Sequence, residues 1–194
     1  ELVFPRVKSN YNILSISNKK VQSYRSLYFD TSDNFFYLSH HNERVNRNKV
    51  RFREYLDSGL SFLEVKTKNN KGKTIKKRTS VPLIPNELSD VHKIFINDTI
   101  GKKLCLVPQQ WIYFDRITFV DKMFTERLTI DINLKFSYAS SLDNFENIVI
   151  AEIKKDKSTS SSFFTQIAKK NHIFPTRISK YCMSTIKLNP NIKH

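Results

Sequence analysis

Along one stretch of the chain, the cations Lys49, Arg51 and Arg53 alternate with apolar residues. Successive side chains of a β-strand point to opposite faces, so this spacing predicts a strand with cations on one face and Val50 and Phe52 on the other. Like charges on one strand face repel each other. An anion is therefore the natural partner of this face.

The same pattern returns in other stretches predicted as strands. Each has one apolar side and one side that carries cations with a few carboxylates. The solvent face of an ordinary antiparallel sheet would carry mixed polar residues, whereas here Lys and Arg dominate. The polar residues concerned are Lys49, Arg51, Arg53, Glu64, Lys66, Lys76, Arg78, Arg116, Arg127, Asp131, Glu152 and Lys154.

Turn signals and periodicity give the elements that position these residues. The turn Asp57-Ser58-Gly59 predicts a β-hairpin between its two flanking strands. Helical spacing of apolar residues predicts helices over 86–97, near 163–168 and near 178–185. The predicted strands are 24–31, 49–56, 61–68, 74–81, 103–107, 111–120, 124–136 and 147–155, and residues 35–42 could form another strand.

Closing such a sheet into a barrel would turn the polar faces into a lumen wide enough for one slender ligand. The sequence therefore predicts an α+β, mainly β fold. Its expected architecture is an antiparallel eight-stranded β-barrel tunnel with a polar cationic lumen, flanked by about three helices. No linker divides the chain, so residues 1–194 are expected to form a single domain.

Composition favours an anionic partner. The 194 residues include 33 Lys and Arg against 18 Asp and Glu, a formal net charge of +15. Such a charge predicts binding of nucleic acid, phosphates or an anionic membrane surface. Aromatic platforms do not interleave with the cations, so nucleic acid is not the expected partner.

The two cysteines, Cys105 and Cys182, lie far apart, and neither spacing supports a zinc site. Unpaired thiols are typical of a reducing cytosol. No apolar run approaches the length that spans a bilayer, and the first residues lack the features of a signal peptide. The expected location is the cytoplasm, either alone or as the cytosolic domain of a membrane-associated system.

The chain resembles the catalytic domain of the vacuolar transporter chaperone (VTC) polyphosphate polymerases, members of the triphosphate tunnel metalloenzyme or CYTH-like superfamily. The resemblance covers about residues 23 to 185, and its motifs occur in the family's order. They are Ser26-Leu27-Tyr28-Phe29-Asp30-Thr31, Lys49-Val50-Arg51-Phe52-Arg53-Glu54-Tyr55, Leu63-Glu64-Val65-Lys66, Lys76-Lys77-Arg78, Asp115-Arg116, Glu126-Arg127-Leu128-Thr129-Ile130-Asp131, Ala151-Glu152-Ile153-Lys154 and Ser179-Lys180-Tyr181.

The resemblance implies a tunnel that binds triphosphate or polyphosphate together with Mn²⁺ or Mg²⁺. The residues expected to be catalytic are Arg51, Arg53, Lys66, Arg116, Arg127 and Lys180. Those expected to bind phosphate are Lys76, Arg78, Lys154, Arg177 and Ser179.

The expected metal ligand is Glu152, with Glu64 and Asp131 as further candidates. Two alternatives remain open from the residues alone: an ion pair between Glu152 and Lys154, and a role for Glu64 in orienting an arginine. Family members also begin with an upstream strand that carries a basic residue, and the sequence shows no convincing equivalent.

The implied reaction is metal-dependent transfer of the γ-phosphoryl group of ATP, or of another nucleoside triphosphate, to a growing polyphosphate chain. The nucleophile is already an anionic phosphate oxygen, so the protein must mainly neutralise charge and position the reactants. The alternatives are a triphosphatase, a nucleotidyl cyclase of the same superfamily, and a non-catalytic module that binds polyphosphate or another polyanion. A membrane protein is a further expected partner.

Overall fold

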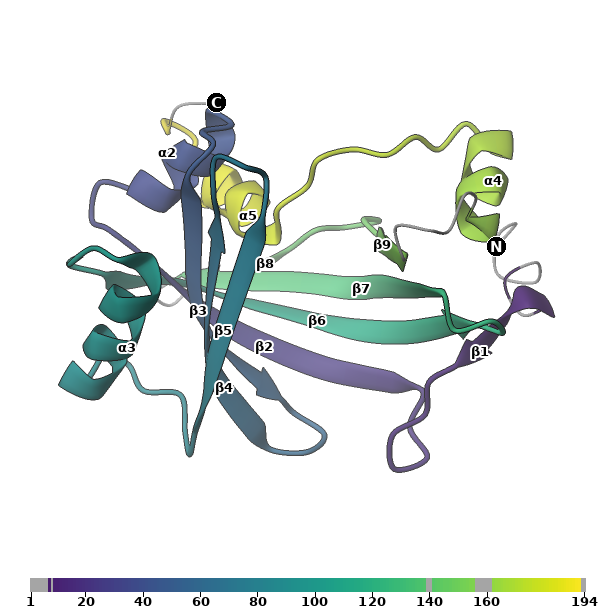
Figure 1. Ribbon diagram of the computed structural model, residues 1–194, viewed down its shortest axis with the longest axis horizontal. Coiled ribbons are helices and arrows are strands. Elements are labelled where there is room, and N and C mark those ends of the chain that lie inside the picture. The colour runs from purple at the N-terminus through teal and green to yellow at the C-terminus, as the bar shows by residue number, and fades with distance from the viewer. Residues whose placement is uncertain (1–6, 8, 139–140, 156–161, 193–194) are drawn as a thin grey trace. The chain divides into compact units, whose positions relative to one another are not determined.

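The structure is a computed structural model that describes residues 7, 9–138, 141–155 and 162–192 (Figure 1). Within these residues the chain forms nine strands and four helices. The strands are β1 (Tyr11–Ile13), β2 (Val21–Asp30), β3 (Arg47–Tyr55), β4 (Leu60–Lys68), β5 (Thr74–Val81), β6 (Val107–Asp121), β7 (Glu126–Tyr138), β8 (Ser141–Asn144) and β9 (Ile150–Lys155). The helices are α2 (Phe35–His41), α3 (Asp90–Ile100), α4 (Phe163–Lys170) and α5 (Lys180–Leu188).

The strands pair in the order β5-β4-β3-β2-β6-β7-β8, while β1 also pairs with β6 and β9 with β7. The pairings whose registers are defined are antiparallel. The prediction of a mainly β, antiparallel fold is therefore confirmed. The described strands number nine instead of eight, their sheet does not close on itself, and four helices accompany them instead of about three.

Contacts divide the chain into two compact units. The first unit comprises residues 1–23, 114–134 and 145–177; the second comprises residues 24–113, 135–144 and 178–194. Strands β2, β6 and β7 contribute residues to both units.

The hairpin of β3 and β4 builds the core of the second unit. Val50 lies opposite Val65, and Phe52 lies opposite Leu63. All four side chains are completely buried, together with Leu27 and Phe29 of β2. The alternation read from the sequence is thus confirmed, and it turns the cations of β3 to the other face.

Helix α2 replaces the strand that seemed possible over residues 35–42. The Asp30 carboxylate accepts hydrogen bonds from the backbone N–H groups of Phe36 and Tyr37, at 2.7 and 2.9 Å. Thr31 Oγ1 accepts one from Phe35 N at 2.9 Å. These side chains satisfy the first N–H groups of the helix, which no apolar pattern within the helix could reveal.

Smaller differences concern the ends of elements. Residues 103–106 form no strand, and β6 begins at Val107. Strand β8 was not predicted, because its four exposed residues show no apolar alternation. A strand upstream of β2 does occur: β1 pairs with β6, but its sequence Tyr-Asn-Ile carries no basic residue. Lys8 lies outside the described residues.

The core of the first unit lies on one side of β6 and β7. Phe119, Leu128 and Ile130 are buried there with Tyr11 of β1, and Phe164 of α4 packs against them. The alternation of β7 places Arg127, Thr129 and Asp131 on its other face. Among the described residues, no helix combines the length and the apolar character needed to cross a membrane.

Candidate functional site

Three lysines lie side by side across three neighbouring strands of the second unit. In the sheet register, Lys49 of β3 is opposite Lys66 of β4, and Lys66 is opposite Lys76 of β5. Residues directly opposite each other in antiparallel strands lie on the same face, where like charges destabilise the pairing. We call these three residues the lysine row.

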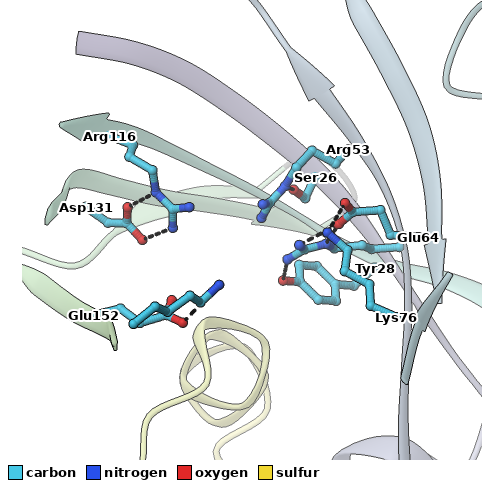
Figure 2. Close-up of polar contacts among 10 residues, drawn as sticks. Ser26, Tyr28, Arg53, Glu64, Lys76, Arg116, Asp131 and Glu152 are labelled. Carbon is cyan, nitrogen blue, oxygen red and sulfur yellow. Dashed lines mark hydrogen bonds and ion pairs between the residues drawn. The ribbon is translucent and has the colours of Figure 1, made fainter. Parts of the chain in front are cut away.

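The next cross-strand row contains a buried carboxylate between cations. Arg51 is opposite Glu64, and Glu64 is opposite Arg78. Arg51 donates from Nε and Nη2 to Glu64 Oε2, at 2.8 and 2.6 Å, and Lys76 Nζ lies 2.5 Å from Glu64 Oε1 (Figure 2). Arg51 Nη1 donates to the hydroxyl of Tyr28 at 2.8 Å. Glu64 therefore orients two cations. For this residue the sequence left open a role as a metal ligand or a role in orienting an arginine, and the contacts correspond to the second role.

Arg53 is the most buried cation of the same face. It is 8% exposed, and its Nε donates to Ser26 Oγ at 3.2 Å (Figure 2). Its guanidinium lies 5.5 Å from the centre of the Tyr24 ring. Arg78 is exposed, and its guanidinium lies 4.7 Å from the centre of the Phe62 ring. Aromatic rings thus hold both guanidinium groups in place.

Residues at the start of helix α5 contact this face. Ser179 caps the helix, and its Oγ accepts hydrogen bonds from Lys49 Nζ at 2.9 Å and from Cys182 N at 3.3 Å. Lys180 is the first residue of the helix. The ring of Tyr181 stacks on that of Tyr28 with centres 5.2 Å apart.

Two tyrosines and an aspartate of this region were not predicted as site residues. The hydroxyl of Tyr181 donates to Asp30 Oδ2 at 2.8 Å, which connects α5 to β2 and α2. Tyr28 and Asp30 face the cations because they alternate with Leu27 and Phe29. The family motifs over residues 26–31 and 179–181 include these three residues. The motifs do not reveal that the side chains of Tyr28, Asp30 and Tyr181 contact one another.

The cations of the second unit change the acidity of their neighbours. Burial would raise the pKa of Glu64, but Arg51, Arg53 and Lys76 outweigh it and lower this pKa to about 2. Burial likewise opposes ionisation of Tyr28, yet Arg51, Arg53 and Lys49 lower its pKa to about 8. Both shifts indicate a strongly positive potential.

The pKa values of one histidine and two lysines at this face are lowered, as expected for groups that become positively charged near other cations. Burial, together with Lys49, Arg47, Lys66 and Lys68, lowers the pKa of His40 to about 3. Burial and the neighbouring charges of Lys66 and Arg51 lower the pKa of Lys49. For Lys76, burial lowers the pKa while Glu64 opposes the shift. This face of the second unit thus disfavours additional positive charge.

In the first unit, Arg116 and Asp131 form a bidentate ion pair. Arg116 Nε and Nη2 donate to the two carboxylate oxygens of Asp131, at 2.6 and 2.8 Å (Figure 2). Both side chains are largely buried, and the guanidinium of Arg116 lies 5.2 Å from the centre of the Phe114 ring. The pair fixes the position of Arg116, because parallel donors match both oxygens.

Other predicted residues of the first unit are exposed. Arg127 of β7 lies opposite Lys154 of β9 in the register. Lys154 Nζ is 3.5 Å from Glu152 Oε1, and both side chains are more than half exposed. Arg177 lies outside the helices and strands and is exposed.

Of the three predicted metal ligands, Glu64 and Asp131 are held by cations, and Glu152 is the one that suits a divalent cation. Both oxygens of Asp131 accept from Arg116, and Glu64 is held by Arg51 and Lys76. In the described part of the chain, no three His, Cys, Asp or Glu side chains gather as a metal site. Glu152, exposed and only loosely paired, fits a metal that arrives with phosphate oxygens, since Mg²⁺ is often bound by one carboxylate plus substrate phosphates.

The predicted residues therefore fall into two groups. The second unit brings together Arg51, Arg53, Glu64, Lys66, Lys76, Arg78, Ser179 and Lys180. The first unit contains Arg116, Arg127, Asp131, Glu152, Lys154 and Arg177.

The family model described as the VTC domain matches residues 1–189. No curated protein matches the chain significantly.

Several solved structures share the fold at low sequence identity. A candidate adenylyl cyclase from Hippeastrum with a dominant triphosphatase activity is 15% identical, with a TM-score of 0.56 over 95% of this chain and 89% of that one. A candidate adenylate cyclase from Vibrio parahaemolyticus is 12% identical, with a TM-score of 0.54 over 94% and 90%. One from Bacillus halodurans is 14% identical, with a TM-score of 0.53 over 84% and 82%. The chain thus shares the fold of these proteins.

Proposed function

The chain belongs to the VTC domain family, and on that premise we propose that it is a polyphosphate polymerase. The proposed reaction transfers the γ-phosphoryl group of ATP to the terminal phosphate of a growing polyphosphate chain. The family model spans residues of both units, which supports the proposal that residues 1–194 form one domain.

The lysine row is the observation that carries this proposal. Lys49, Lys66 and Lys76 follow one another on adjacent strands, and their face carries Arg51 and Arg53 as well. A polyphosphate chain has a negative charge at each phosphate, so its repeating charges match a repeating line of cations. Binding would replace the repulsion between lysines by charge-assisted hydrogen bonds.

The protein's part in the reaction would be binding and charge neutralisation. The attacking oxygen is anionic, so no general base is required, and phosphoryl transfer depends mainly on positioning and electrostatic stabilisation. In the second unit, Arg51 is held rigidly by Glu64 and Tyr28 and would bind phosphate oxygens without reorganising. In the first unit, the exposed cations Arg127 and Lys154 would bind phosphate oxygens.

Glu152 would hold a divalent cation together with phosphate oxygens, and the cation would supply further charge neutralisation. The exposed carboxylate of Glu152 supports this assignment. Mn²⁺ and Mg²⁺ both prefer oxygen ligands, so either ion suits the proposal.

Incubation of the protein with ATP and Mn²⁺ tests the reaction, with products separated by length on a gel. We expect polyphosphate chains and ADP. Lys66→Ala should reduce synthesis strongly, whereas Lys77→Ala should not. Lys77 lies on the same hairpin, is also exposed, and is opposite Val65 and therefore on the other face. Equal activity of both variants would remove the lysine row from the site.

A triphosphatase is the second candidate. The structural neighbour from Hippeastrum has a dominant triphosphatase activity on the same fold. This reaction would release orthophosphate without polyphosphate in the same assay. An absence of ATP consumption, combined with retained binding of tripolyphosphate, would instead identify a non-catalytic binding module.

The cellular setting is proposed on the same basis. We infer that the domain works in the cytoplasm on nucleoside triphosphates and polyphosphate, and that a membrane protein is a partner. Fractionation of cells that express a tagged chain, followed by crosslinking, tests both statements.

A further inference from the structure

The first unit contains a cavity of about 310 Å³. Residues of β1, of the turn between β6 and β7, and of α4 form its walls. Glu126 lines the cavity and belongs to the face of β7 opposite to that of Arg127. Within the first unit, the cavity therefore lies on the side of β7 opposite to Arg127, which is proposed above to bind phosphate.

Glu126, which lines this cavity, has one buried carboxylate oxygen without a hydrogen-bond partner in the part of the chain that the structure describes. Glu126 is 4% exposed, and its Oε1 accepts a hydrogen bond from the hydroxyl of Tyr11. Its Oε2 has no hydrogen-bond partner within the described part of the chain. Lys155, opposite Glu126 in the register, is exposed and makes no hydrogen bond to Oε2. An unsatisfied buried oxygen costs free energy that a bound donor would recover.

The neighbouring oxygens are already engaged. Asp121 Oδ1 accepts from Glu126 N at 2.7 Å, and Oδ2 accepts from the Thr125 hydroxyl at 3.0 Å. A divalent metal ion prefers about six oxygen ligands. In the described part of the chain no three His, Cys, Asp or Glu side chains gather as a metal site, and at the cavity Glu126 Oε2 is the oxygen without a hydrogen bond. A nitrogen donor that carries a positive charge suits a single carboxylate oxygen better than a metal does.

Three lining side chains, Tyr11, Met123 and Phe163, suit an alkyl chain, whereas the rest of the lining is polar and includes Lys122. The rings of Tyr11 and Phe163 lie with centres 6.4 Å apart, and the side chain of Met123 is 78% exposed at the rim. Aromatic faces attract ammonium groups and pack against methylene groups. The volume is at the low end for sites that bind small molecules, so it fits a short ligand.

We propose that this cavity binds a primary alkylammonium group, which donates to Glu126 Oε2 while its alkyl chain lies against Tyr11, Phe163 and Met123. The group could come from a free diamine or from the side chain of a lysine in a protein. The shared chemistry is an ammonium on a short apolar chain.

The test uses n-butylammonium as the probe and n-butanol as its neutral counterpart, observed by saturation-transfer NMR and by the methyl resonance of Met123. We expect n-butylammonium to bind and n-butanol to bind at least tenfold more weakly. Glu126→Gln should abolish the difference between the two probes. The control Glu146→Gln removes an exposed carboxylate of the same unit outside the cavity and should change nothing.

A second variant keeps the proposal testable should Glu126→Gln fail to fold. Lys122 is exposed at the cavity, so Lys122→Glu should leave the fold intact and tighten binding of n-butylammonium severalfold by adding an attractive charge. Unchanged affinity in this variant, or equal binding of n-butanol, overturns the proposal. Broadening of the Met123 signal by Mn²⁺ that Glu126→Gln removes would identify a metal site and also overturn it.

The source of the ammonium is decided by two further probes. Tighter binding of 1,4-diaminobutane than of N-acetyl-lysine methylamide supports a free diamine. The reverse order supports a lysine side chain of a partner protein.

Discussion

At the scale of residues, the buried carboxylate Glu64 explains how cations can be held close together before any anion binds. Glu64 is 3% exposed and contacts both Arg51 and Lys76, and these cations keep it ionised. Removing one partner of a buried pair costs about 3–5 kcal/mol, because the other charge is left uncompensated. Arg51 is therefore part of the fold as well as a candidate ligand for phosphate.

Arg127 provides the cleaner test of phosphate binding, because it is exposed and its loss should leave the fold intact. Arg127→Ala should weaken binding of tripolyphosphate about tenfold, which corresponds to ~1.4 kcal/mol. Isothermal titration calorimetry measures the change. Lys155→Ala removes the same charge from the other face of β9 and should bind as the wild type does. Equal losses in both variants would indicate a general effect of net charge.

Tyr28 should report directly on occupancy of the cationic face. Its pKa in the folded protein is about 8, below the ordinary value of 10.0. The phenolate therefore stabilises the fold fully above pH 10.0, and this contribution is lost as the pH falls through about 8. Tripolyphosphate would neutralise the nearby cations and raise the pKa of Tyr28.

The ultraviolet absorbance of the phenolate, measured as wild type minus Tyr28→Phe during a pH titration, follows this change. We expect a transition near pH 8 that moves upward when tripolyphosphate is added. A transition that does not respond to the anion would place the bound phosphates away from Arg51 and Arg53.

At the scale of elements, Asp30 connects three parts of the second unit. It lies at the end of β2, accepts from the first turn of α2, and accepts from Tyr181 of α5. Since Ser179 of α5 contacts Lys49, the position of one lysine of the row depends on the docking of this helix. Burial raises the pKa of Asp30 although these donors oppose the shift.

Asp30→Asn should lower the free energy of unfolding by roughly 3 kcal/mol, because an amide NH₂ would face N–H donors in place of an acceptor. Chemical denaturation measures the loss. Asp33→Asn, an exposed change in the following turn, should cost little. A similar small effect of both changes would mean that α2 and α5 are held by packing alone.

The alternation of apolar and charged residues was enough to predict β3 and β4 and the face that each presents, whereas in β5 Lys77 interrupts the pattern. Strand periodicity is local, so it can be read without knowledge of the neighbours. Helix α2 was not predictable in this way, because its first N–H groups are satisfied by Asp30 and Thr31 from the preceding strand and turn. The pairing of Glu64 with two cations likewise was not predictable, because it depends on the register of β4 with β3 and β5, and the sequence of a single strand does not give that register.

At the scale of the whole molecule, the formal net charge of +15 sets the response to anions. A ligand that binds only the folded state stabilises it by about 2.7 kcal/mol at one hundred times its Kd. For a chain of this size, that corresponds to a rise in Tm of roughly 5–10 °C.

We therefore expect tripolyphosphate to raise Tm at concentrations where orthophosphate has little effect, and added salt to reduce the rise. Differential scanning fluorimetry measures the shift. A rise of the same size with orthophosphate would indicate a single anion site, which would contradict recognition of an extended phosphate chain.

Strand β5 carries the third member of the lysine row, and it ends the sheet order (Figure 1). Within Thr74–Val81, Val81 alone is buried, so β5 is held mainly by its ladder with β4. Its amide protons should exchange with solvent deuterium faster than those of β3 and β4, since terminal strands open at low free energy. An anion that contacts Lys76, Lys66 and Lys49 together would stabilise the pairing of β5 with β4 through side-chain contacts. Deuterium uptake across 74–81 should then become slower when the anion binds.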